Sequence, residues 1–94
     1  MYYALVLETD GYEFLIDTRD LWRPECVYLR RGCELTAVWL GHPVSFAAPP
    51  RLRPAERKRA LALVREHRDE LLDRWFSLKD DVCRDRLERN LLVE

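Results

Sequence analysis

The hydrophobic pattern of this chain changes its period at residues 49–54, a segment that holds three of the five prolines. Before this segment, short runs rich in β-branched and aromatic residues are separated by turn residues, which predicts β-strands. After it, apolar residues return at the spacing of one face of a helix. The residues that set this helical spacing are Leu61, Val64, Leu71, Trp75 and Leu78.

These two halves predict a single α+β domain over residues 1–94, since a chain of this length makes one domain. We expect an antiparallel sheet of four to five strands in residues 1–48. Proline fits the first turn of a helix, so a long amphipathic C-terminal helix is predicted over 54–78, packed against the sheet. Residues 79–94 form an extension that is either a further helix after a bend near Asp80-Asp81 or an extended tail.

The dipeptide Asp10-Gly11 indicates the turn of a first β-hairpin, because both central positions must tolerate a positive φ. The predicted cross-strand pairs are Thr9 with Tyr12, Leu7 with Phe14, Leu5 with Ile16 and Tyr3 with Thr18. One face of this hairpin is then almost wholly apolar and needs the helix as its cover. The expected core consists of Leu7, Phe14, Ile16, Leu61, Val64, Leu71 and Trp75.

A second hairpin is predicted from residues 26–30 and 33–40, with its turn at Arg31-Gly32. This turn would pair Cys26 with Ala37 and Arg30 with Cys33. A short last strand is expected over 44–47. The loop before the second hairpin carries Trp22, a candidate anchor for a partner, because tryptophan is enriched at interface hot spots.

Charge is strongly segregated along a chain whose formal net charge is only −1. Residues 51–68 carry seven basic and two acidic side chains, a balance of +5. Several of these cations lie in the first turns of the predicted helix, where the helix dipole favours acids. The predicted basic face consists of Arg51, Arg53, Arg57, Lys58, Arg59, Arg65 and Arg68.

Two interpretations of this basic face stay open. It is either a surface that binds a partner, or a solvated helix face neutralised by the chain's own acids, notably Glu8, Glu13 and Asp17. The first hairpin places Glu8 directly opposite Glu13, where like charges repel. This pair could accept a cation or an arginine of a partner, or could point apart into water.

No catalytic, metal or cofactor site is predicted. The spacing of Cys26, Cys33 and Cys83 with His42 and His67 does not fit the familiar zinc arrangements. We expect reduced thiols and a cytoplasmic protein, since the cysteines are few, odd in number and not preceded by a signal peptide. No apolar run approaches the length of a membrane span, so no membrane partner is expected.

The segment 52–75, LRPAERKRALALVREHRDELLDRW, resembles the C-terminal helix of a small bacterial family, domain of unknown function 4160. The resemblance extends to Gly11-Tyr12 and to a strand ending in Val38-Trp39-Leu40, and it covers most of residues 1–78. The family usually shows a Pro-Pro-His-x-His run entering the second hairpin, and here residues 24–28 read Pro-Glu-Cys-Val-Tyr. The roles of those histidines therefore do not transfer. The resemblance implies a compact bacterial protein encoded beside a small partner, as in toxin–antitoxin pairs.

These observations favour a non-catalytic protein-interaction or regulatory module that acts through its basic face. The expected partner is the small product of a neighbouring gene, as in a toxin–antitoxin-like pair, or a second copy of the chain. One alternative is a small RNA-binding protein or ribonuclease toxin, because Arg65 and Arg68 flank His67 and could surround a phosphate. Another is a structural subunit of a larger assembly, with residues 79–94 as its docking element.

Overall fold

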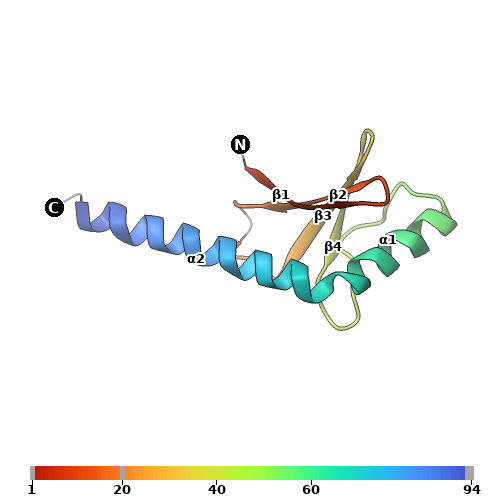
Figure 1. The fold of residues 1–94 in the computed structure, drawn as a ribbon. Helices are drawn as coiled ribbons and strands as arrows, with labels where there is room; N and C mark the ends of the chain where they lie inside the picture. The colour runs from red at the N-terminus through yellow and green to blue at the C-terminus, as the bar shows by residue number, and fades with distance from the viewer. Residues whose placement is uncertain (1, 20, 93–94) are drawn as a thin grey trace.

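The computed structural model describes residues 2–19 and 21–92 of the chain, with side chains up to residue 85 and at residue 87. It contains an antiparallel five-stranded sheet and two helices, as predicted for an α+β domain (Figure 1). The strands lie in chain order across the sheet, β1-β2-β3-β4-β5. The elements are β1 (Tyr3–Thr9), β2 (Tyr12–Asp17), β3 (Cys26–Arg31), β4 (Glu34–Trp39), β5 (Ser45–Phe46), α1 (Pro54–Glu66) and α2 (Arg68–Leu92).

The first hairpin turns at Asp10-Gly11, where φ is 54° at Asp10 and 78° at Gly11. The pairs next to the turn are the predicted ones, Thr9 with Tyr12 and Leu7 with Phe14. Beyond them the predicted register is wrong, because β1 contains a bulge and Val6 has no partner on β2.

The bulge changes which side chains of β1 face the core. The observed pairs are Leu5 with Leu15 and Tyr3 with Asp17, instead of Ile16 and Thr18. Leu5 is therefore 50% exposed on the far face of the sheet, while Val6 packs against the core.

The second hairpin turns one residue later than predicted, at Gly32-Cys33, with φ of 61° at Gly32. Glycine at the first central position is the requirement of a type II′ turn, whereas the prediction had placed it second. Cys26 consequently pairs with Trp39, and Arg30 with Leu35, in place of Ala37 and Cys33. The pairing moves by two residues, so each side chain keeps its expected face.

The predicted single helix over 54–78 is wrong, since two helices meet at His67. The His67 amide donates to the Leu63 carbonyl (3.1 Å), which ends α1, and the His67 carbonyl accepts from the Leu71 amide (2.9 Å) in α2. From Arg68 the helix runs without a break through Asp80-Asp81 to Leu92. Residues 79–92 are therefore helical but without the predicted bend, and residues 93–94 lie outside the described part.

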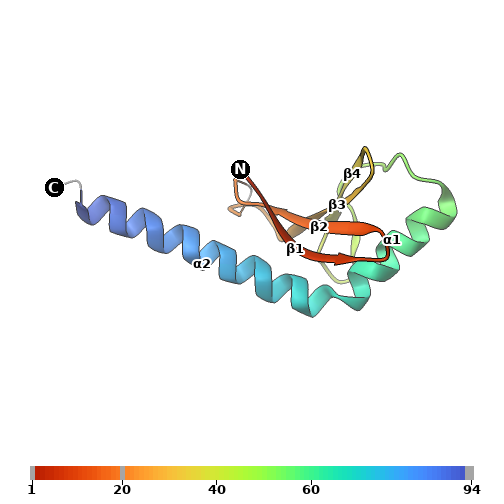
Figure 2. The ribbon, with the colours of Figure 1, turned by 45° about the horizontal axis from the view of Figure 1, so that its top comes forward.

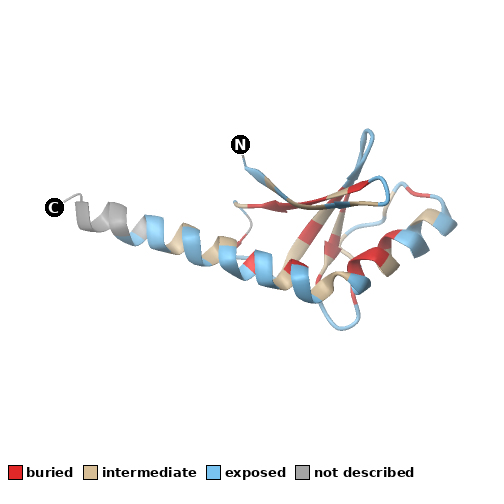
Figure 3. Cartoon of the chain, viewed as in Figure 1, coloured by how far each residue is buried: buried red, intermediate tan, exposed pale blue. Residues whose placement is uncertain are grey.

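Both helices lie on one side of the sheet and no helix covers the other side (Figures 1 and 2). The core forms between that side and the helices, where buried residues concentrate in Figure 3. Of the predicted core residues, five are buried and two, Leu7 and Leu61, are half-buried at its margin. The five buried ones are Phe14, Ile16, Val64, Leu71 and Trp75.

The molecule is elongated, with principal extents of 55 × 27 × 22 Å, because α2 continues beyond the sheet (Figure 1). Val82 is the last residue of α2 that packs against the core among those described. The C-terminal third of α2 therefore projects from the rest of the fold. Among the described residues, no helix is long and apolar enough to cross a membrane.

Candidate functional site

Three residues of the predicted basic face support the fold. Arg57 Nε donates to the Leu52 carbonyl at 2.8 Å and holds the segment before α1 against the helix. Arg59 Nε lies 2.6 Å from Asp10 Oδ2 and ties α1 to the turn of the first hairpin. Arg68 Nε donates to the carbonyls of Leu40 and Gly41, both at 3.1 Å, and fixes the loop between β4 and β5.

The remaining basic residues do not form one anion site. Arg51, Arg53 and Lys58 are exposed around the start of α1. Arg65 and Arg68 line an open hollow of about 370 Å³ beside His42, but Glu66 and Asp69 line the same hollow. Its charges are therefore mixed, which does not favour a polyanion.

His67 lies at the junction of the two helices. This position does not favour the alternative in which it is a general base between Arg65 and Arg68. Its ring meets the ring of Phe14 edge to face, with centroids 6.1 Å apart. Its Nδ1 is 3.5 Å from Glu70 Oε2. Since its side chain contacts the core and the backbone on both sides ends or begins a helix, His67 has a structural role here.

Glu13 and Asp17, two of the acids expected to neutralise the basic face, pair with other arginines. Glu8 and Glu13 lie opposite each other, as predicted, but Glu13 forms a two-point ion pair with Arg30 of β3, at 3.1 and 2.8 Å. This hydrogen-bonded guanidinium lowers the pKa of Glu13. Of the alternatives left open for the Glu8–Glu13 pair, Glu13 thus has an arginine partner, and the chain itself supplies it.

The uncovered face of the sheet carries a row of apolar side chains across its strands, because cross-strand partners share a face. The row is formed by Leu5, Leu15, Tyr28 and Ala37, each paired with the next. Leu15 is only 4% exposed although it lies outside the main core. We call this surface, with Cys26, Trp39, Ala47 and the residues around it, the open face.

A pocket of about 220 Å³ lies on the open face, where the small side chains of Ala37 and Ala47 stand beside the large ones of Tyr28 and Trp39. Sites for small organic ligands usually have volumes of about 300–1,000 Å³. This pocket is smaller, and its size suits one inserted side chain better than a cofactor. The lining residues are Arg23, Cys26, Tyr28, Ala37, Trp39 and Ala47.

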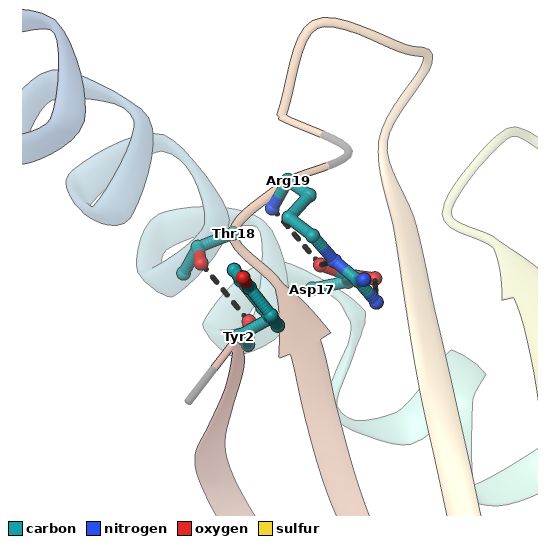
Figure 4. A network of polar contacts seen from close by, with 4 residues as sticks. All are labelled: Tyr2, Asp17, Thr18 and Arg19. Carbon is teal, nitrogen blue, oxygen red and sulfur yellow. Dashed lines mark hydrogen bonds and ion pairs between the residues drawn. The ribbon is translucent and has the colours of Figure 1, made fainter.

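The rim of the open face near β1 is held by a polar network (Figure 4). The buried carboxylate of Asp17 accepts from Arg19 Nε at 3.1 Å and from Arg19 Nη2 at 2.9 Å, and this pair lowers the pKa of Asp17. The same guanidinium lies over the ring of Tyr2, 4.3 Å from its centroid. Tyr3 in turn meets the Tyr28 ring edge to face, with centroids 5.7 Å apart. These contacts order the aromatic side chains before any partner binds.

The open face was missed by sequence reasoning, although Trp22, the predicted partner anchor, lies in the loop beside it. This residue is 49% exposed in the loop that also supplies Arg23 to the pocket. The pattern of β3 and β4 offered a signal, since Cys26, Tyr28, Ala37 and Trp39 alternate with the buried Val27, Leu29, Thr36 and Val38.

Metal ligands do not gather in the described part of the chain. No group of three or more histidine, cysteine, aspartate or glutamate side chains is placed there to hold an ion. Cys26, Cys33 and Cys83, all within that part, are not joined in disulfides.

No family model, no curated protein and no solved structure matches this chain. The resemblance to domain of unknown function 4160 therefore stays a prediction, and the geometry of the open face carries the functional argument.

Proposed function

We propose that this chain is a non-catalytic protein-interaction module that binds a protein partner through the open face of its sheet. The single observation that carries the proposal is the pocket between Tyr28 and Trp39, on the side of the sheet that neither helix covers. Binding energy at protein interfaces concentrates in central pockets lined by aromatic and arginine side chains. The open face has this composition.

The distribution of polarity on the open face also suits a protein partner. Its middle is apolar, with Leu5, Leu15 and Ala37 in one row. Its charges lie at the edges, where Glu13 pairs with Arg30 and Asp17 with Arg19. An apolar centre with a polar rim is the usual anatomy of a protein–protein interface. A nucleic-acid surface would need a continuous excess of cations, whereas here each of these two arginines already has a carboxylate.

The partner would be the small product of a neighbouring gene, in a regulatory pair of the toxin–antitoxin kind acting in the cytoplasm. This part of the proposal depends on the resemblance to domain of unknown function 4160. The run in which the chain departs from that family, residues 24–28, enters β3 and supplies Cys26 and Tyr28 to the pocket. The change in residues 24–28 would be explained if the partner of this chain inserts a different side chain into the pocket than the partners of that family do.

The test is a titration of the purified chain with the neighbouring gene product, followed by calorimetry. Ala37→Arg fills the pocket and should weaken binding by at least about tenfold, the effect of losing a hot spot. The matched control is Ala55→Arg, the same change on the exposed surface of α1 within the basic face.

The result separates the two surfaces. Affinity lost with Ala37→Arg and kept with Ala55→Arg supports the open face. Unchanged affinity with a folded Ala37→Arg variant would overturn the proposal. Affinity lost only with Lys58→Glu, which reverses an exposed cation of the basic face, would assign binding to that face. Binding to unstructured RNA with a steep salt dependence would favour the nucleic-acid alternative instead.

A further inference from the structure

Beyond Val82, none of the described side chains of α2 packs against the core. Val82 is the last described residue that packs against the core, and the helix runs on for ten residues to Leu92, about 15 Å at the usual rise. Helical segments of this length are marginal in water when nothing packs against them. A surface that covers this end would therefore stabilise it.

An apolar stripe runs along α2 beside the line that packs on the sheet. At 100° per residue, the core line of Leu71, Trp75, Leu78 and Val82 occupies one arc, and the stripe lies roughly 120° around the helix from it. Phe76 is 48% and Leu87 is 64% exposed on the stripe. The stripe consists of Phe76, Cys83 and Leu87, and it begins beside Leu72, which is half-buried against the core.

We propose that a second copy of this chain packs antiparallel along this stripe, about a two-fold axis between residues 81 and 82. In such a pair, a residue of one helix lies opposite the residue of the other copy that is the same number of positions from the axis, in the other direction along the sequence. Phe76 then meets Leu87 of the second copy, and Leu87 meets its Phe76. Phe76 and Leu87, the large exposed apolar side chains of α2 among the described residues, thus cover each other twice in one symmetric contact.

Charge complementarity supports the same register. With this axis, the residue directly opposite Arg84 is Lys79 of the second copy, whose ammonium lies over its own Trp75 ring, 5.2 Å from the centroid. The next residue, the exposed Asp80, is then the acid nearest to Arg84, and the pair occurs twice. Both side chains are exposed, and Arg84 is 4.0 Å from Asp81 of its own helix, at the long limit of an ion pair. A reciprocal pair of opposite charges beside a reciprocal pair of apolar side chains is a self-complementary surface, which is the requirement of a two-fold interface.

The location of the stripe permits this packing. Because Phe76, Cys83 and Leu87 do not pack against the core, a second helix can run beside α2 along them without displacing the sheet. The stripe is also distinct from the open face, which is on the opposite side of the sheet from the helices (Figure 2). The proposal is thus independent of the proposed function, and each can fail without the other.

Sedimentation equilibrium of the full chain tests the pair. The wild-type chain should be a dimer at micromolar concentration, and Leu87→Glu should raise its dimer dissociation constant by at least tenfold. The matched control is Leu35→Glu, since Leu35 is 47% exposed on β4 and far from α2 in the fold. This control should dissociate like the wild type, and far-ultraviolet circular dichroism should show that both variants are folded.

A charge exchange tests the register. Asp80→Arg and Arg84→Asp should each weaken the dimer, because each places like charges opposite each other, and the double variant should restore it. A wild-type chain that stays monomeric at several hundred micromolar would overturn the proposal. So would a Leu87→Glu variant that dissociates no more than Leu35→Glu, and a double variant without restoration would overturn the antiparallel register.

Discussion

The two faces of the sheet are built by the same strands and differ in what covers them. On the covered face, Phe14, Val27 and Val38 are fully buried under α1 and α2. On the open face, Leu15 is buried without a helix above it, and Leu35 remains half exposed. Alternate residues of one strand therefore serve two purposes. The covered face stabilises the fold, and we propose that the open face, no less aromatic, is kept for a partner.

The largest effect should come from breaking the covered face. Leu71 is fully buried where α2 meets the sheet, so Leu71→Ala removes buried methyl groups and leaves a cavity. The free energy of unfolding should fall by about 2–5 kcal/mol. Urea denaturation followed by tryptophan fluorescence measures it. A loss below about 1 kcal/mol would mean that the helix contributes little to the core.

The next effect concerns the buried carboxylate at the rim of the open face. Asp17 is 5% exposed and bound at two points by Arg19, so Asp17→Asn should cost about 1–2 kcal/mol at neutral pH. Glu13→Gln, in the more exposed pair with Arg30, should cost less.

The same carboxylate should make stability depend on pH. The folded protein holds the pKa of Asp17 below its ordinary value, so the pair stabilises the fold fully above that value and loses its effect as the pH falls through the lowered one. Stability of the wild type should therefore fall below about pH 4 more steeply than that of Asp17→Asn. Thermal melts of the wild type and of Asp17→Asn between about pH 2 and 7, the range over which carboxylates titrate, measure this difference. Parallel curves of melting temperature against pH would contradict the prediction.

Arg59 tests whether part of the basic face belongs to the fold. Arg59→Glu places two acids together at Asp10, where the wild type has an ion pair, and should lower the melting temperature by a few degrees. Lys58→Glu is the matched control on the same helix turn. It adds an acid near the helix N-terminus, where the dipole favours it, and should leave the melting temperature unchanged or slightly raised. Equal effects of the two variants would show that Arg59 has no special role.

Sequence reasoning reached the fold class and most of the core, because long-range periodicity decides them. It also predicted the first turn, because this turn needs a positive φ at both central residues and Asp-Gly is one of the few pairs that readily adopt it. The bulge at Val6 was beyond reach for a physical reason. Residues 2–7 are all apolar, so no polar side chain indicates which of Leu5 and Val6 faces the core.

The candidate site was less predictable than the fold. The partner of Arg59 is Asp10, 49 residues earlier in the chain, and a run of charges does not reveal which of them are used internally. The break at His67 carries no glycine or proline to announce it. Which face of the sheet stays open depends on the side against which the helices pack. The alternation in β3 and β4 identifies two faces, but both contain apolar residues.

The smallest effect on the free energy of unfolding should come from a substitution on the open face. This variant gives the clearest comparison between the two faces of the sheet. Leu35 is 47% exposed and lies opposite Arg30 on β3, so Leu35→Ala removes side-chain area that is already half in water. Surface substitutions of this kind change stability by less than about 0.5 kcal/mol, against several times that for Leu71→Ala. Urea denaturation of the two variants side by side measures the ratio. If Leu35→Ala cost more than about 1 kcal/mol, the open face would hold a second core that the fold needs. Its apolar side chains would then have a structural reason, and the argument that they serve a partner would lose its basis.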